Sequence, residues 1–317
     1  MICSYRPRGE ALTCQDTLES DAPWIDLVQP DAEERATVSK LVGFDLPSLA
    51  DQEEIEHSSR LYLERGIPVM TALLTVRTDT GTVETAPVTF IPTPDRLVTI
   101  RHQPHGAFRA FHDHPDRSSL GVDSATRILV GLIEAVVDRL ADFTEQVGRE
   151  IDLMTRAAFQ IGEGRTDDHE AALRDIGRQD TVVMQIRESL TSLDRLLGFL
   201  QPSLGKSGDG DEARRAIKSA QRDVRTISEQ ANFLTSKTAL LLDATLGMIS
   251  IEQNDIGKTF SIVATVFLPP TLIASIFGMN FTVMPILEWR WGYYACLALM
   301  VATAVAPLLW FKRKGWL

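Results

Sequence analysis

FSIVATVFLPPTLIASIF, residues 260–277, contains no charged residue, and neither does WGYYACLALMVATAVAPLLWF, residues 291–311. The two stretches are 18 and 21 residues long. With a rise of about 1.5 Å per residue, an α-helix of either length is about long enough to cross the ~30 Å hydrocarbon core of a membrane. They predict a C-terminal hairpin of two transmembrane helices joined by a short loop.

Charge is distributed unevenly along the 317-residue chain, which has a net charge of −11. Residues 258–317 contain five Lys and Arg residues and one acidic residue, Glu288, so they carry +4 and residues 1–257 carry −15. An acidic region of this kind argues against nucleic-acid binding, which needs clustered Lys and Arg. It suits divalent cations, although solubility alone would also explain it.

Basic residues on both sides of the hairpin predict its orientation. Lys258 precedes the first stretch, and Lys312, Arg313 and Lys314 follow the second. By the positive-inside rule both flanks are cytoplasmic, and the loop of residues 280–290 faces outside. The N-terminal residues contain no apolar run, so we expect no signal peptide and an acidic region in the reducing cytoplasm.

Residues 1–120 are predicted to form a small α/β domain. Residues 24–28, 69–77, 83–91 and 96–101 are rich in the Val, Ile, Thr and Leu that are typical of strands. Pro30, followed by three acidic residues, begins a helix. We expect a mostly antiparallel sheet flanked by helices.

Residues 121–257 are predicted to form a stalk of long helices. Apolar residues recur at spacings of three and four in residues 122–161 and 166–200. A third helix, residues 211–278, continues into the first apolar stretch and needs the other two helices, and sister chains, to cover its apolar stripe. Its stripe alternates spacings of four and three: Ala220, Val224, Ile227, Ala231, Leu234, Thr238, Leu241, Thr245 and Met248.

The cysteines and histidines show no strong metal-binding pattern. Cys3, Cys14 and Cys296 match no metal-ligand or disulfide framework. Four histidines lie within thirteen residues: His102, His105, His112 and His114. On a helix this spacing would chelate a transition metal, but Pro104 and Gly106 interrupt it, and the alternative is a solvated helix start with incidental histidines. Enzyme motifs are lacking as well, so we expect no enzymatic activity.

After the first apolar stretch comes Phe277-Gly278-Met279-Asn280-Phe281, followed by Met284-Pro285 and Trp289. This segment resembles the CorA family of magnesium and cobalt channels, whose mark is Gly-Met-Asn at the outer end of the first membrane helix. Glu252-Gln253-Asn254, residues 267–271, Gly292-Tyr293 and the ending at residues 311–317 are also similar to that family. The resemblance is strong over residues 250–317, and the remainder is similar in layout more than in residues.

The resemblance implies an α+β membrane protein with three parts. These are an N-terminal cytoplasmic α/β domain (residues 1–120), a long helical stalk that continues into the first of two transmembrane helices (121–257), and the transmembrane hairpin (258–317). It further implies a homopentamer in the lipid bilayer of the bacterial inner membrane, with both termini cytoplasmic. The implied cargo is Mg²⁺, with Co²⁺ and Ni²⁺ as further ions, driven by the membrane potential and gated by cytoplasmic Mg²⁺. No other cofactor is expected.

The resemblance also assigns roles to individual residues. Gly278, Met279 and Asn280 form the ion-selective mouth, where neutral Asn280 amides accept hydrogen bonds from hydrated Mg²⁺ without stripping its water. Gly-Asn is also typical of a helix C-cap. The pore-lining candidates are small or weakly polar apart from one apolar constriction, Leu268: Asn254, Gly257, Ala264, Leu268, Thr271 and Ser275. Small residues also favour close packing of membrane helices, and Pro269-Pro270 predicts a bend that is either structural or a gating hinge.

Three departures from the family pattern affect these roles. Phe277 stands where the family usually has Tyr, and the loop reads Met284-Pro285-Ile286-Leu287 instead of Met-Pro-Glu-Leu. Attraction of cations to the outer loop therefore either depends on Glu288 or is weaker than in the family. The family's regulatory Mg²⁺ sites have no gap-free match, and the stalk offers four candidates: Asp209, Asp211, Asp223 and Glu229.

Two alternatives remain open. A zinc transporter of the same fold is compatible with the residues, because a neutral Asn ring need not dehydrate zinc either. A non-conducting membrane ion sensor or scaffold is the alternative from another class, although a sensor does not need small residues along a pore face.

Overall fold

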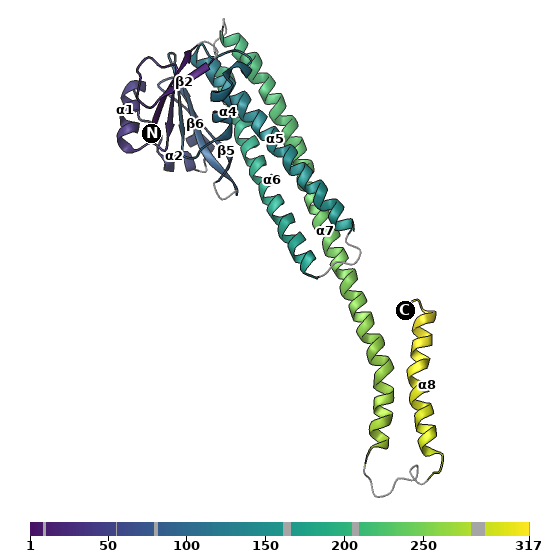
Figure 1. Ribbon diagram of the computed structural model, residues 1–317. Coiled ribbons are helices and arrows are strands. Elements are labelled where there is room, and N and C mark those ends of the chain that lie inside the picture. Colours follow the sequence, from purple (N-terminus) through teal and green to yellow (C-terminus); the bar gives the residue numbers. More distant parts are fainter. Residues whose placement is uncertain are drawn as a thin grey trace. The chain divides into compact units, whose positions relative to one another are not determined.

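The structure is a computed structural model that describes residues 1–8, 11–54, 56–78, 82–160, 166–204, 209–279 and 289–316. The chain divides into two compact units, Met1–Leu242 and Asp243–Leu317. The first unit contains a sheet and the helices that cover it. The second contains the end of a long helix and one further helix (Figure 1).

A seven-stranded sheet lies in the first unit, with the strand order β2-β1-β3-β7-β6-β5-β4. The strands are β1 (Ile2–Arg8), β2 (Ala11–Gln15), β3 (Trp24–Val28), β4 (Leu61–Glu64), β5 (Ile67–Arg77), β6 (Val83–Pro92) and β7 (Leu97–Arg101). β3 and β7 pair in parallel, and the other neighbouring strands pair antiparallel. The predicted, mostly antiparallel sheet is confirmed, with β1, β2 and β4 as strands that the sequence analysis missed.

Helices cover both faces of this sheet, so its central strands are buried on both sides. Trp24 of β3 packs into the core cluster that contains residues of α4 (Gly106–Asp113), α5 (Ala125–Gln160) and α6 (Thr166–Leu200). The next residue, Ile25, packs into the opposite cluster with Val38 of α1 (Ala32–Val42). This alternation follows from the two-residue period of a strand. The short helices α2 (Leu49–Glu53) and α3 (His57–Arg60) complete the N-terminal part.

The start of α1 shows how local sequence sets an element boundary. Asp31 is the N-cap: its side chain accepts hydrogen bonds from the backbone N–H groups of Glu33 and Glu34, and the Glu34 side chain accepts one from the Asp31 N–H. This capping box satisfies N–H groups that have no partner inside the helix. Gly43 ends the helix with a φ of 90°, a left-handed conformation that favours glycine.

The three long helices occur where periodicity predicts them. The third, α7 (Asp209–Phe277), is a continuous helix of 69 residues. Its predicted stripe is buried from Ala220 to Thr245, and only Met248, at its end, is partly exposed. In the first unit the stripe joins the same core cluster as α5 and α6. Side chains also tie the helices together, since Gln221 of α7 donates a hydrogen bond to Asp194 of α6 at 3.0 Å.

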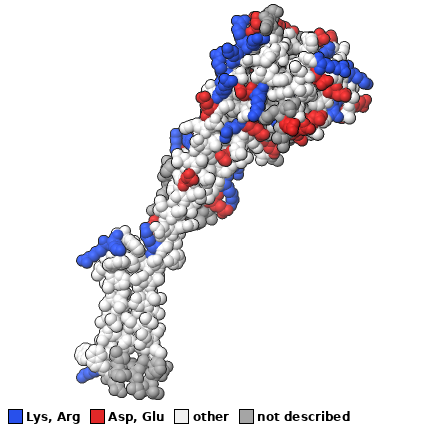
Figure 2. Space-filling model, turned by 180° about the vertical axis from the view of Figure 1, so that it is seen from behind, with Lys and Arg blue, Asp and Glu red and all other residues white. Residues whose placement is uncertain are grey.

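The second unit contains the two candidate membrane spans. The C-terminal part of α7 and the 22-residue helix α8 (Gly292–Arg313) each include a window with a mean hydropathy of 2.0. Both helices are long and apolar enough to cross a membrane. On the face drawn in Figure 2, their surface shows no charged residue between basic side chains at its two ends.

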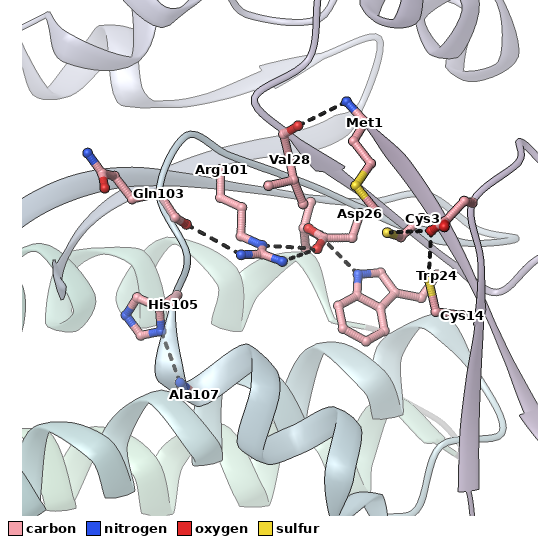
Figure 3. Close-up of polar contacts among 12 residues, drawn as sticks. Met1, Cys3, Cys14, Trp24, Asp26, Val28, Arg101, Gln103, His105 and Ala107 are labelled. Atoms are coloured by element: carbon pink, nitrogen blue, oxygen red, sulfur yellow. Dashed lines mark hydrogen bonds and ion pairs between the residues drawn. The ribbon is translucent and has the colours of Figure 1, made fainter. Parts of the chain in front are cut away.

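A buried ion pair joins two central strands. Asp26 of β3 is fully buried, and one of its carboxylate oxygens accepts hydrogen bonds from the Arg101 guanidinium of β7 at 2.9 Å (Figure 3). The other oxygen accepts the Thr99 hydroxyl at 2.6 Å, and Thr99 in turn accepts the Trp24 indole N–H at 2.9 Å. The carboxylate is therefore tolerated in the core because its charge is paired and both its oxygens accept hydrogen bonds.

We expect Arg101→Met to destabilise the folded chain by about 3–5 kcal/mol, because it leaves the Asp26 charge buried without a partner. The urea midpoint of the full chain in detergent measures the loss. Adding Asp26→Asn should restore part of it. The matched control is Arg174→Met, which breaks the exposed pair with Glu170 and should cost less than about 1 kcal/mol. Equal losses for Arg101→Met and Arg174→Met would contradict this account.

Candidate functional site

The Gly-Met-Asn segment follows directly on α7. The helix ends at Phe277, and the Gly278 N–H still donates to the Ala274 carbonyl at 2.9 Å. A Cβ on Gly278 would lie 3.1 Å from that carbonyl oxygen, closer than a side-chain carbon normally sits. Gly278 does not adopt a left-handed φ. The absence of a side chain there instead allows the backbone of Gly278 to lie close to the Ala274 carbonyl oxygen. Met279 is exposed, and Asn280 and Glu288 lie outside the described residues.

The six predicted pore-lining residues are all exposed in the single chain: Asn254, Gly257, Ala264, Leu268, Thr271 and Ser275. At about 100° per residue, all but Asn254 fall within about 60° of one another around α7. Ile262, which is buried, lies about 160° from Ala264 around the helix. The face that carries the candidates is therefore not the face that the chain itself buries there.

The polar members of this face keep acceptor oxygens available. The Thr271 hydroxyl donates its hydrogen to the Phe267 carbonyl at 2.7 Å, so its oxygen retains a lone pair for an outside donor. Leu268 is 71% exposed, although it is a large apolar residue. A hydrated cation carries water O–H donors, and this face offers it weak acceptors and no charge.

Aromatic and basic residues mark both ends of α8. Trp291, Tyr293 and Tyr294 are exposed at its start. At its end, the Lys314 ammonium lies 4.5 Å from the ring centre of Trp310. Amphipathic aromatic rings and snorkelling lysines are typical of the two membrane–water interfaces.

The four predicted regulatory acids have different surroundings. Asp209 accepts a hydrogen bond from Arg127 of α5 at 2.9 Å, so an arginine already balances its charge. Asp211 and Glu229 are exposed on α7. Asp223 is also exposed, and its negative charge raises the pKa of Asp138, an acidic residue of α5.

Asp138 belongs to an acidic group that the sequence analysis missed. Burial raises the pKa of its carboxyl group, and the charges of Glu134, Asp142 and Asp223 raise this pKa further. Glu134, Asp138 and Asp142 recur every four residues along α5, which places them on one face of the helix. The four-residue spacing could have indicated the three acidic residues of α5 from the sequence. Only the fold brings Asp223 of α7 close to these three residues.

The histidines are not gathered in the structure. His105 is the N-cap of α4: its Nδ1 accepts the Ala107 N–H at 3.2 Å, and burial lowers its pKa to about 4 (Figure 3). His112 bonds Asp113 at 3.0 Å, and burial lowers the pKa of His102. A helix does begin here, but His105 is buried and capping, which corrects the expectation of a solvated helix start.

Two of the three cysteines, whose spacing in the sequence matches no metal-ligand framework, lie close together in the structure. Cys3 of β1 and Cys14 of β2 lie with Asp16 so that their sulfur and oxygen atoms are within 4.8 Å of one another. Sequence spacing did not indicate this group, because an antiparallel pairing of strands creates it.

A second apolar line on α7 is exposed. Phe233 and Leu240 are 64% and 69% exposed. Seven residues apart, they lie within about 20° of each other around the helix, well away from the buried stripe. Exposed apolar lines of this kind mark interaction surfaces.

We expect Asp138→Asn to raise the unfolding temperature of the full chain at pH 7, and to change it little at pH 4. The pKa of Asp138 is higher in the folded than in the unfolded chain, so the folded state binds this proton more tightly. The resulting stability is complete below the unfolded pKa, near ~4, and is lost as pH rises through the folded-state pKa. Thermal denaturation at both pH values measures it. Glu145→Gln, an exposed change on the same helix, is the control, and an equal gain from it would refute the assignment.

Comparisons with known proteins agree with the architecture. Residues 19–313 match the family described as CorA-like Mg²⁺ transporter protein. The magnesium transport protein CorA of Yersinia pseudotuberculosis is 32% identical over 323 residues, and that of Escherichia coli K12 is 32% identical over 321 residues; each comparison covers 100% of both chains.

A solved structure shares the fold. The complete structure of the CorA magnesium transporter from Methanocaldococcus jannaschii superposes with a TM-score of 0.75 at 18% identity, over 100% of this chain and 98% of the other. The sheet, the long helix and the C-terminal helix are therefore elements of a known fold. Together with the full-length identity of 32% to the curated relatives, the family match shows that the chain belongs to the CorA-like Mg²⁺ transporter family.

Proposed function

We propose that this chain is the subunit of a channel that imports Mg²⁺, with Co²⁺ and Ni²⁺ as further cargo. One observation carries the proposal: α7 is a continuous helix whose charge-free end is followed directly by Gly278-Met279-Asn280. Family membership and the magnesium-transport names of its full-length relatives support the choice of ion. Transport, and not catalysis, is the proposed activity.

Selectivity is assigned to the mouth that follows α7. Mg²⁺ releases water reluctantly and prefers octahedral oxygen coordination. A ring of neutral Asn280 amides accepts hydrogen bonds from the intact water shell, and the carbonyl of Gly278 approaches it because no side chain intervenes. A ring of carboxylates would bind the ion more tightly and release it more slowly.

A homopentamer is the proposed assembly, with the face of Gly257, Thr271 and Ser275 turned to a shared axis. Two exposed surfaces of α7 support assembly: this weakly polar face, and the apolar line of Phe233 and Leu240. In that arrangement Leu268 forms an apolar ring that closes by dewetting. We place both termini in the cytoplasm of a cell whose inner membrane holds the hairpin, in accordance with the basic flanks.

The membrane potential supplies the driving force. Two charges moving inward gain ~4.6 kcal/mol per 100 mV, from about 2.3 kcal/mol per charge. No further energy source is needed, and none of the described residues forms a nucleotide-binding loop. In the proposed three-part division at residues 120 and 257, the ion crosses the membrane potential only within the hairpin.

Cytoplasmic Mg²⁺ is the proposed regulator, bound by acidic residues of the stalk. The group of Asp138, Glu134, Asp142 and Asp223 fits this role, because its members repel one another without a cation. Oxygen donors are also the ligands that Mg²⁺ prefers. Loss of the ion restores the repulsion, and the stalks then separate. Asp209 fits less well, since Arg127 already neutralises it.

The zinc transporter and the non-conducting sensor remain the alternatives. A zinc transporter would take up zinc without magnesium. A sensor would assemble normally and pass neither ion, so the same uptake assay distinguishes the three.

We expect Asn280→Ala to lower Mg²⁺ uptake by at least about tenfold, the equivalent of one lost hydrogen bond of ~1.4 kcal/mol at the mouth. Uptake is measured with an enclosed Mg²⁺ dye, in liposomes with a negative interior, and with Zn²⁺ and Co²⁺ as competitors. Asn232→Ala, the same change on an exposed stalk position of α7, is the matched control. Light scattering should give the mass of five chains for both variants.

The outcomes separate the readings. Uptake that needs Asn280 and is weakly displaced by Zn²⁺ supports the magnesium channel. Zinc uptake without magnesium uptake replaces it with the zinc transporter. Flux of neither ion through a correctly assembled protein replaces it with the sensor.

We expect Asp223→Asn to weaken the inhibition of uptake by Mg²⁺ inside the liposomes, because it removes one charge from the acidic group. The measurement is the internal Mg²⁺ concentration that halves uptake, which should rise several-fold, on the scale of one weakened ion contact. The matched control is Asp209→Asn, on the same helix, whose charge Arg127 balances. An unchanged concentration for Asp223→Asn, or an equal rise for Asp209→Asn, would remove Asp223 from the regulatory site.

A further inference from the structure

Two thiols and one carboxylate converge at the edge of the sheet, in the first unit. The Cys3 and Cys14 thiols each point at the same oxygen of Asp16, at sulfur–oxygen distances of 3.8 and 3.7 Å (Figure 3). All three ligand atoms lie within 4.8 Å of one another. Three potential ligand atoms thus lie close enough together to surround one cation.

These distances suit a tetrahedral cation. With metal–sulfur bonds of about 2.3 Å and metal–oxygen bonds of about 2.0–2.2 Å, a tetrahedral site holds its sulfur and carboxylate oxygen atoms roughly 3.5–3.6 Å apart. The observed separations are longer by only a few tenths of an ångström. Side-chain rotation alone can close that difference.

The strand register favours a shared ion over a disulfide. Cys14 pairs with Tyr5, so Cys3 and Cys14 are diagonal neighbours on β1 and β2 and not directly opposite. Diagonal neighbours are about 7–8 Å apart, whereas a disulfide needs Cα atoms within roughly 6.8 Å. A metal ion joins the two sulfur atoms through two metal–sulfur bonds instead of one sulfur–sulfur bond, so it can connect residues that are diagonal neighbours.

The surroundings leave the site accessible and its carboxylate free to bind a cation. A cavity of about 400 Å³ is lined by Cys3, Cys14, Tyr5 and His112. Cys14 and Asp16 are exposed, while Cys3 is buried. Within the described part of the chain, Asp16 forms no ion pair that would compete with a metal. The cavity beside the two thiols leaves room for a water molecule as a further ligand.

We propose that Cys3, Cys14 and Asp16 bind one thiophilic divalent cation, Zn²⁺ or Co²⁺, with a water molecule as the fourth ligand. Two sulfur donors exclude Mg²⁺, which takes oxygen ligands. The site is therefore separate from the magnesium path in its chemistry and in the residues it uses. It does not depend on the proposed transport function.

Binding exchanges protons for the metal without a redox change. Each S–H group releases its proton to solvent, two metal–sulfur bonds and one metal–oxygen bond form, and the three anionic ligands leave the site with a net charge of −1. Burial raises the pKa of Cys3 to about 12 and also raises the pKa of Cys14, so both thiols are protonated at neutral pH without metal. Apparent affinity should then rise about 100-fold per pH unit, tenfold for each proton released.

Other charged and titratable groups lie around these thiols and contribute to that pH profile. They are Tyr5, Asp26, Arg101, His105, Arg109 and His112. His112, whose Nδ1 bonds Asp113, also lines the cavity. A His112→Ala variant should retain the two-proton slope.

The test uses the full chain in detergent, reduced and freed of metal, titrated with Co²⁺. We expect one Co²⁺ per chain to give a thiolate-to-cobalt charge-transfer band and intense tetrahedral visible bands, displaced by Zn²⁺ and not by excess Mg²⁺. Co²⁺ bound by oxygen ligands in a transport path gives no thiolate band, so failure here and failure of the transport proposal are distinguishable.

Variants assign the ligands. Cys14→Ser and Cys3→Ser should abolish the band, and Asp16→Asn should lower the affinity at least about tenfold, the usual effect of a lost metal contact. Cys296→Ser, the change at the remaining cysteine, is the matched control and should keep the band. Because Cys3 is buried, far-UV circular dichroism is used to check that the Cys3→Ser variant is folded. If that variant unfolds, the exposed Cys14 provides the test through Cys14→Ser. A band that is absent from the parent chain, or that survives Cys14→Ser, overturns the proposal.

Discussion

Burial of one stripe of α7 against α5 and α6 is the constraint on which the rest of the structure depends. Helices in proteins gain most of their stability from tertiary packing and little from propensity, so a helix of 69 residues needs a partner along its length. Val224 and Ala231 are fully buried, and Leu234 contacts the helix surface at Gly148 of α5. The stripe leaves other sides of α7 exposed, and those sides carry the candidate pore-lining residues and the apolar pair of Phe233 and Leu240.

Periodicity was enough to predict the elements that repeat along the chain. The second long helix begins at Thr166 and ends at Leu200 as predicted, and β3 has its predicted bounds, Trp24–Val28. In both cases local sequence and tertiary packing favour the same structure. β1 and β2 were missed because Pro7 and two arginines interrupt the apolar alternation, and because edge pairing is decided by contacts distant in sequence.

The candidate site divides in the same way. Gly278 and the exposed face of Thr271 followed from a motif and from helical spacing, both of which are local. The acidic group of Asp138 and Asp223 and the thiol group of Cys3 and Cys14 each join two elements, α5 with α7 and β1 with β2. Residue spacing within one helix or strand cannot predict a contact between residues of two different elements. Gly278 directly follows the last residue of α7, Phe277, where the Gly-Asn pattern predicts a C-cap, but its φ is not left-handed.

The two kinds of cation chemistry that we propose for this chain would discriminate ions by different properties. A neutral amide that hydrogen-bonds the water shell senses the size and charge of a hydrated ion, so it separates Mg²⁺ poorly from Co²⁺. A thiolate sulfur prefers soft, polarizable metal ions. It bonds directly to the metal, so it binds Co²⁺ or Zn²⁺ only after water molecules have left the ion. A thiol site in the first unit would therefore distinguish the very ions between which the amide mouth does not. Because burial raises the pKa of the Cys3 thiol, a cation would have to displace protons from the thiols to bind at the proposed site.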